Sequence, residues 1–70
     1  MEKIEFQLST EYIELIKLLK FLRIAESGGH AKLLVDSGEV LLNGNQETRK
    51  RAKIRVGDKI EVFNFEINIA

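Results

Sequence analysis

The sequence contains no cysteine and no proline, and His30 is its only histidine. Without cysteine, disulfide bonds, thiolate metal sites and cysteine nucleophiles are all excluded. His30 has no second histidine nearby and no Glu-x-x-His spacing, so a surface position on a helix is favoured over metal binding. We therefore expect neither a metal nor a cofactor.

Long apolar runs are also absent, because none approaches the roughly 20 residues that a membrane span needs. The first residues, Met1-Glu2-Lys3-Ile4, show neither the basic region nor the apolar region of a secretion signal. Secretion and membrane insertion are therefore unsupported, and we expect a cytoplasmic protein.

Side chains that could carry catalysis are few. The hydroxyl groups that could act as nucleophiles belong to Ser9, Thr10, Ser27, Ser37 and Thr48. Several of them have structural interpretations as helix caps, and no catalytic triad can be assembled from them. Glu26 near His30 is the only local acid/base candidate, so an enzyme is not favoured.

A chain of 70 residues with 44% hydrophobic residues fits one small folded domain. Such a chain buries only about 60% of the surface that its unfolded form exposes, so nearly every aliphatic residue must join the core. We expect one domain over residues 1–70, with binding rather than a separate catalytic unit.

The first half of the chain predicts a strand followed by a helix. Residues 2–8 alternate polar and apolar side chains, which is typical of a half-buried strand. Ser9 or Thr10 can cap a helix that begins near Glu11, and leucines and isoleucines then recur at helical spacing. The aromatic side chains fit apolar positions in this pattern and its continuation, so we expect them in the core: Phe6, Tyr12, Phe21, Phe63 and Phe65.

The remainder predicts a second helix and a group of strands. Ser27 is a suitable N-cap for a helix that ends at Gly38. Residues 40–42 form a strand, and Asn43-Gly44 after it is a strong signal for a tight turn. Further strands are expected near 59–63 and 66–69, which makes the fold class α+β.

Charge is balanced overall but unevenly distributed. Residues 1–40 hold five Lys/Arg and seven Asp/Glu, whereas residues 41–70 hold six and four. Within residues 48–55 stand five cations: Arg49, Lys50, Arg51, Lys53 and Arg55. One interpretation is a solvated loop that aids solubility. The other is a surface for RNA, DNA or an acidic protein, since concentrated cations repel one another unless an anion offsets them.

The segment Ser27-Gly28-Gly29 at the start of the second helix also has two interpretations. Unpaired backbone N–H groups at a helix start can bind phosphate. Alternatively, glycine allows the helix to pack closely against its neighbours. We give the two interpretations equal weight, and they can hold together.

Several pieces of the sequence, in this order, resemble the S4-type RNA-binding domain. They are Leu18-Leu19-Lys20-Phe21-Leu22, Ser27-Gly28-Gly29-His30-Ala31-Lys32, Gly38-Glu39-Val40-Leu41-Leu42-Asn43-Gly44 and Gly57-Asp58. The resemblance covers residues 15–62. It implies two helices packed on a small, mostly antiparallel bent sheet that binds structured RNA.

By this resemblance, the RNA-binding role falls to Lys32, Arg49, Lys50, Arg51 and Lys53. Our candidate surface also includes Lys20, Ser27, Gly28, Gly29, His30 and Arg55. The family often has arginine near the starts of both helices, where this chain has Glu14, Glu26 and the two glycines. The segments Ser-Gly-Gly-x-Ala-Lys at residues 27–32 and Glu-Thr-Arg-Lys-Arg at residues 47–51 look like those of small stand-alone bacterial members.

Larger relatives join such a module to pseudouridine synthases, tRNA synthetases or ribosomal proteins. We expect a monomer that binds structured rRNA or tRNA mainly through backbone phosphates and is associated with ribosomes. The alternative is a protein–protein adaptor on a ribosomal or replication assembly.

Overall fold

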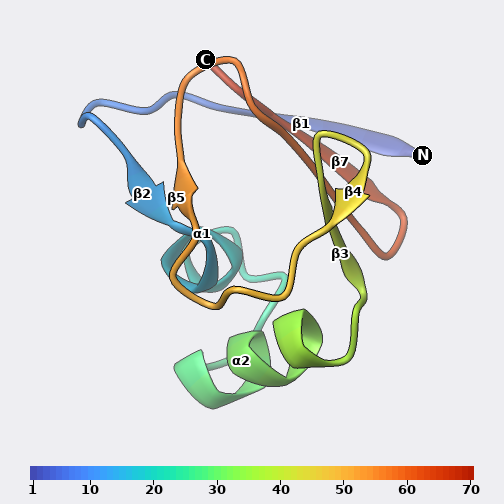
Figure 1. Ribbon diagram of the computed structural model, residues 1–70. Coiled ribbons are helices and arrows are strands. Elements are labelled where there is room, and N and C mark those ends of the chain that lie inside the picture. Colours follow the sequence, from blue (N-terminus) through green and yellow to red (C-terminus); the bar gives the residue numbers. More distant parts are fainter.

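The computed structural model describes residues 1–70 and contains two short helices and seven strands (Figure 1). The helices are α1 (Leu15–Phe21) and α2 (Gly28–Asp36). The strands are β1 (Glu2–Phe6), β2 (Ile13–Glu14), β3 (Val40–Leu42), β4 (Asn45–Gln46), β5 (Lys53–Ile54), β6 (Lys59–Val62) and β7 (Phe65–Ile69).

Five of the strands form one sheet in the order β1-β7-β6-β3-β4, and β2 pairs separately with β5. The strand β1 runs parallel to β7, and every other pairing is antiparallel. This confirms the α+β class and the mostly antiparallel sheet expected from the sequence. The strands predicted near 59–63 and 66–69 correspond to β6 and β7.

The core lies between the helices and the main sheet and is aliphatic. Its fully enclosed members come from both layers: Leu15, Leu18, Leu19, Val35, Val40, Ile54, Ile60, Val62 and Ile67. Burying an aliphatic side chain of this size stabilises the fold by roughly 1.5–3 kcal/mol. A chain this small therefore depends on nearly all of them.

The aromatic side chains do not fill the core, so that expectation was wrong. Phe21 is 69% exposed, and Phe63 is also exposed because it lies with a φ of 53° in the turn between β6 and β7. Phe6 is half-buried against the edge of the core. The aliphatic residues alone fill the small interior, which leaves no space for an aromatic ring at its centre.

The first helix begins at Leu15, four residues later than predicted. Neither Ser9 nor Thr10 caps it, since the Thr10 hydroxyl donates to the Tyr12 carbonyl and Glu14 occupies the N-cap position without a side-chain bond. Residues 13–14 instead form β2. The apolar pattern that predicted a helix from residue 11 also fits this strand, because alternate side chains of a strand are apolar too.

The start of α1 is completed by a distant segment. The Leu15 N–H donates to the Ala52 carbonyl at 2.9 Å, and the Ile16 N–H donates to the Lys50 carbonyl at 3.2 Å. The first N–H groups of a helix have no partner within it and need one elsewhere. Residues 50–52 therefore act as the cap that Ser9 and Thr10 were expected to provide.

The second helix agrees with its prediction. The Ser27 hydroxyl accepts a hydrogen bond from the His30 N–H at 3.1 Å, which is the expected N-cap contact. At the other end Gly38 has a φ of 81°, the left-handed conformation that glycine tolerates best. The side chains of Ala31, Leu34 and Val35 face the core.

The Asn43-Gly44 turn is confirmed, since both residues have positive φ and they join β3 to β4. The Asn43 side chain also makes a long-range contact: its amide donates to an Asp58 carboxylate oxygen at 3.0 Å and its oxygen accepts from the Lys59 N–H at 2.9 Å. The other Asp58 oxygen accepts from the Arg55 N–H at 2.8 Å. These hydrogen bonds therefore hold the Asn43-Gly44 turn against the turn at Asp58 and the start of β6.

Neither helix is long and apolar enough to cross a membrane.

Two adjacent leucines in α2 test how strongly the fold depends on its core. Leu34 is 7% exposed, whereas Leu33 is 67% exposed. We expect Leu34→Ala to lower the free energy of unfolding by about 2–5 kcal/mol, because it leaves a cavity. We expect Leu33→Ala to change it by less than about 0.5 kcal/mol. Urea unfolding followed by circular dichroism measures both, and equal effects would contradict the described core.

Candidate nucleic-acid interface

Four of the predicted cations surround one hollow on the surface. Arg49, Arg51, Lys53 and Arg55 line it together with Ala52, and its volume is about 420 Å³. No carboxylate lines this hollow. It is therefore a concentrated positive site of a size that accommodates a phosphate group.

The strand pattern of the segment explains why its cations face outward. Ala52 and Ile54 are buried, while Arg51, Lys53 and Arg55 between and beside them are exposed. Side chains alternate between the two faces of an extended chain. The inward pair anchors the segment in the core, and the outward side chains are thereby held on one face.

Arg49 is only partly available because it pairs with Glu47. Its Nε lies 3.0 Å from Glu47 Oε2, and a terminal nitrogen lies 3.1 Å from Oε1. Hydrogen bonds from the Arg49 side chain lower the pKa of Glu47, and the same bonds raise the pKa of Arg49. Glu47 is the one buried charged residue. The pair with Arg49 therefore has a structural role, because it neutralises a buried carboxylate.

Tyr12 lies beside the hollow and was missed as a site residue. Lys53 Nζ lies 5.0 Å from the centre of the Tyr12 ring, and the Arg55 guanidinium carbon lies 5.8 Å from it. Cations at these distances are attracted to the aromatic face. No sequence signal pointed to this role, because the pairing of β2 with β5 is what brings Tyr12 next to both cations.

Lys50 connects the basic segment with α2. Its Nζ lies 3.3 Å from an Asp36 carboxylate oxygen. Lys32 precedes Asp36 by four residues, so both lie on one face of the helix, and both are exposed. Gly29 lies on the same face, about two turns before Asp36. This separation is about 10 Å along the helix axis, because a helix rises 1.5 Å per residue. This face of α2 therefore extends from the basic segment toward the start of the helix.

The glycines at the start of α2 are not needed for close packing. A Cβ at Gly28 would meet nothing within 4 Å, and one at Gly29 would meet only the Ser27 hydroxyl at 3.8 Å. The packing interpretation of these glycines is therefore wrong. The exposed backbone leaves room for a ligand, and a phosphate contact by Ser27, Gly28 and Gly29 stays a prediction.

His30 takes part in helix capping. Its Nδ1 accepts a hydrogen bond from the Glu26 backbone N–H at 3.1 Å. The contact involves the backbone of Glu26 and leaves its carboxylate out, so the two side chains do not form the acid/base pair considered above. No group of histidine, aspartate and glutamate side chains could hold a metal ion.

Lys20 is exposed in the last turn of α1, where a cation complements the helix dipole. No hydrogen bond or ion pair joins it to the hollow or to α2. The structure thus brings together Arg49, Arg51, Lys53 and Arg55, and it links Lys50 to the face that holds Lys32. The role of each of these residues in binding stays a prediction.

The fold and this basic surface define a class of small α+β domains, and comparison with known proteins identifies the family. The S4 domain model matches residues 6–70. The chain therefore belongs to the S4 domain family, as its sequence motifs indicated.

Three known proteins illustrate the relationship. RlbA of Bacillus subtilis strain 168, named a probable ribosome maturation protein, is 38% identical over 58 residues, which is 83% of this chain and 82% of RlbA. YbcJ of Escherichia coli strain K12 is 36% identical over 58 residues, 83% of each chain.

The solution structure of E. coli YbcJ, described as revealing an αL motif involved in RNA binding, superposes with a TM-score of 0.69 at 31% identity. It covers 100% of this chain and 87% of YbcJ. Heat shock protein 15 of Vibrio cholerae, in a trimeric structure, superposes with a TM-score of 0.68 at 24% identity. That match covers 80% of this chain and 58% of the other, and it shows a shared fold.

The Glu47–Arg49 pair predicts how stability depends on pH. Because the folded pKa of Glu47 is lowered, its contribution is present above the ordinary value of 4.5 and is lost as the pH falls through the folded pKa. We expect Glu47→Gln to lower the free energy of unfolding at pH 7 and the difference from wild type to shrink below about pH 4.5. Denaturant unfolding from pH 7 to pH 3 measures this. A difference that stays constant with pH would contradict the assigned ion pair.

Proposed function

We propose that this protein binds structured RNA, either rRNA or tRNA, through contacts between its cations and backbone phosphates. The hollow is the observation that carries this proposal. Arg51, Lys53 and Arg55 form no salt bridge with any carboxylate. Three cations without a salt bridge in one place repel one another, and a phosphate offsets that repulsion while releasing counterions from the nucleic acid.

Family membership supports RNA as the partner over an acidic protein surface. E. coli YbcJ, which matches the full length of this chain, is described as carrying an RNA-binding motif. RlbA is named for ribosome maturation. No contact in the structure favours the adaptor alternative.

The arrangement of the cations supports recognition of RNA shape. Arginine offers a planar fork to two phosphate oxygens, and lysine offers a mobile point charge. A-form RNA has a deep, narrow major groove, so duplex regions are recognised mostly through phosphates and 2′-hydroxyl groups. The second contact area we propose is the exposed face of α2, with Lys32 and the open backbone of Gly28 and Gly29, which the Lys50–Asp36 ion pair links to the basic segment.

Binding is, in this proposal, the whole activity of residues 1–70, exerted as one unit in the cytoplasm. The His30 ring is engaged in capping α2. Lys20 is assigned a peripheral contact, since nothing in the fold links it to the hollow.

Substituting two unpaired arginines tests the proposal. We expect Arg51→Gln/Arg55→Gln to weaken binding to rRNA fragments or tRNA roughly 10-fold or more, because each loses a charged hydrogen bond. We also expect the dependence of log K on log salt to fall by about 1 for each lost phosphate contact. Fluorescence anisotropy at several salt concentrations measures both. Arg49 and Lys50 are weaker probes, because each already pairs with a carboxylate.

The matched control is Lys3→Gln/Arg23→Gln, which removes the same charge from two exposed cations that also form no salt bridge and lie outside the hollow. This control should bind nearly as wild type does, with both variants folded by circular dichroism. If the two variants lost RNA affinity equally, the loss would reflect the total charge of the protein and would contradict the hollow as the binding site. Absence of salt-sensitive RNA binding by the wild-type protein would overturn the proposal in favour of the adaptor.

Tyr12 should act as a positioning residue for two of the cations. We expect Tyr12→Leu to weaken RNA binding roughly two- to fivefold, since an exposed cation–π contact contributes about 0.5–1 kcal/mol. Tyr12→Phe keeps the aromatic face and should bind as wild type does. Anisotropy titration compares the two variants. If both bound RNA more weakly, the Tyr12 hydroxyl and not the aromatic ring would be the group required.

A further inference from the structure

The strand β1 forms a free edge of the main sheet. Its only neighbour is β7, and it pairs with that strand along all five of its residues. The strand at the opposite end of the sheet, β4, has only two residues. The longer unpaired edge of the molecule is therefore the outer side of β1 (Figure 1).

The backbone groups that this edge presents can be assigned. The N–H of Glu2 and of Leu8 donate to β7-side carbonyls at 2.8 Å, and the Phe6 carbonyl accepts from Ala70 at 2.9 Å. In a parallel pair, alternate residues direct both backbone groups to the neighbour. The intervening residues Lys3, Glu5 and Gln7 therefore direct their N–H and C=O groups outward.

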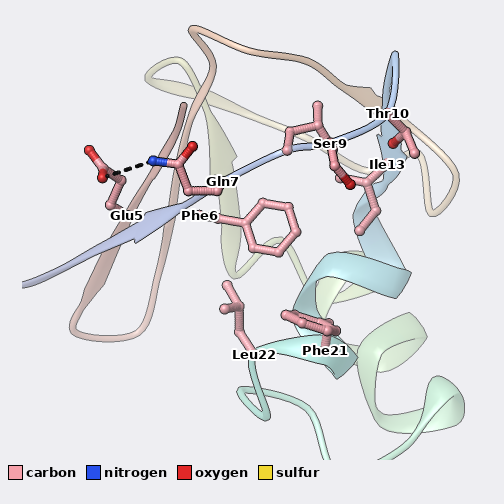
Figure 2. Close-up of a pocket in the computed structure, with 9 residues that line it drawn as sticks. Glu5, Phe6, Gln7, Ser9, Thr10, Ile13, Phe21 and Leu22 are labelled. Atoms are coloured by element: carbon pink, nitrogen blue, oxygen red, sulfur yellow. Dashed lines mark hydrogen bonds between the residues drawn. The ribbon is translucent and has the colours of Figure 1, made fainter.

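Apolar surface borders this edge on the helix side. Figure 2 shows the rings of Phe6 and Phe21 facing each other between β1 and the end of α1, whereas Glu5 and Gln7 project elsewhere. The two ring centres are 5.5 Å apart at an angle of 80°. They line a cavity of about 550 Å³, and Phe21 is 69% exposed. Unpaired backbone and an exposed aromatic ring thus lie side by side.

We propose that this edge pairs with β1 of a second copy of the chain, antiparallel and centred on Ile4. The choice of partner rests on charge complementarity. In this register Lys3 lies opposite Glu5 of the second copy and Glu5 lies opposite its Lys3, while the outward backbone groups face each other. Opposite charges directly across a strand pair are stabilising, and like charges are destabilising.

The neighbouring registers lack this property. The outward backbone groups belong to odd-numbered residues, so the two strands can bond only where odd-numbered residues lie opposite odd-numbered residues. The nearest alternative registers that meet this condition are centred on Lys3 and on Glu5. Centring on Lys3 places two lysines opposite each other, and centring on Glu5 places two glutamates opposite each other. The sequence around Ile4 is therefore self-complementary in one register and repulsive in those on either side.

The resulting dimer has two-fold symmetry and joins the two main sheets edge to edge. Ile4 meets its own copy on the core-facing side, and the surface around Phe6 and Phe21 approaches the partner. The same surface patch serves both copies, as a two-fold interface requires. The contact is small compared with stable interfaces of roughly 1,200–2,000 Å², so association is weak. This state departs from the monomer expected from the sequence.

A charge swap tests the proposal. We expect the wild-type protein to dimerise as its concentration rises from about 10 μM to about 1 mM, which sedimentation measures. Lys3→Glu and Glu5→Lys should each be monomeric over that range, because each places like charges across the strands. The double variant Lys3→Glu/Glu5→Lys restores opposite charges and should dimerise as wild type does. Circular dichroism checks that the exposed substitutions leave the fold intact.

Amide hydrogen exchange supplies a second measurement on the same samples. The N–H groups of Lys3, Glu5 and Gln7 should gain protection at high concentration, whereas those of Ile4 and Phe6, already paired, should not change. A monomer at all concentrations, or a double variant that stays monomeric, overturns the proposal. So does protection of these amides that appears only on adding RNA, which would assign the edge to the nucleic acid.

Discussion

The start of α1 is held by backbone hydrogen bonds from residues 50–52, and the rest of the surface depends on that contact. The Leu15 and Ile16 N–H groups have no partner within the helix, and the Ala52 and Lys50 carbonyls satisfy them. Burial of Ala52 and Ile54 fixes the same segment from the core side. A segment anchored in this way cannot behave as a solvated loop, so its cations are presented in a defined arrangement.

The same anchoring sorts the cations into two kinds. Arg49 and Lys50 pair with Glu47 and Asp36 and thereby connect the segment to its surroundings. The cations lining the hollow beyond Arg49 have no carboxylate partner. A charge run that looked uniform in the sequence therefore contains structural ion pairs beside groups that are available to a ligand. The net charge is nevertheless zero, because residues 1–40 hold more Asp and Glu than Lys and Arg.

Local signals predicted those parts of the fold that are decided locally. The Ser27 cap and the Gly38 stop of α2 depend on a few adjacent residues, as does the Asn43-Gly44 turn, and all three are confirmed. The start of α1 could not be predicted in the same way, because its cap comes from residues more than thirty positions away. Tyr12 was assigned to the core because it fits an apolar position of the predicted helix. Its cationic neighbours are distant in sequence and come close only through the pairing of β2 with β5.

The sequence by itself determined the α+β class, the second helix, the main turns and the concentration of cations in residues 48–55, and its ordered motifs indicated the S4 domain family. These features depend on local conformational preference and composition. Tertiary structure decided which cations are paired, where α1 begins, that Tyr12 borders the hollow and that β1 has an open edge. Those features depend on contacts between distant segments, and hydrophobic periodicity contains no record of which segments meet.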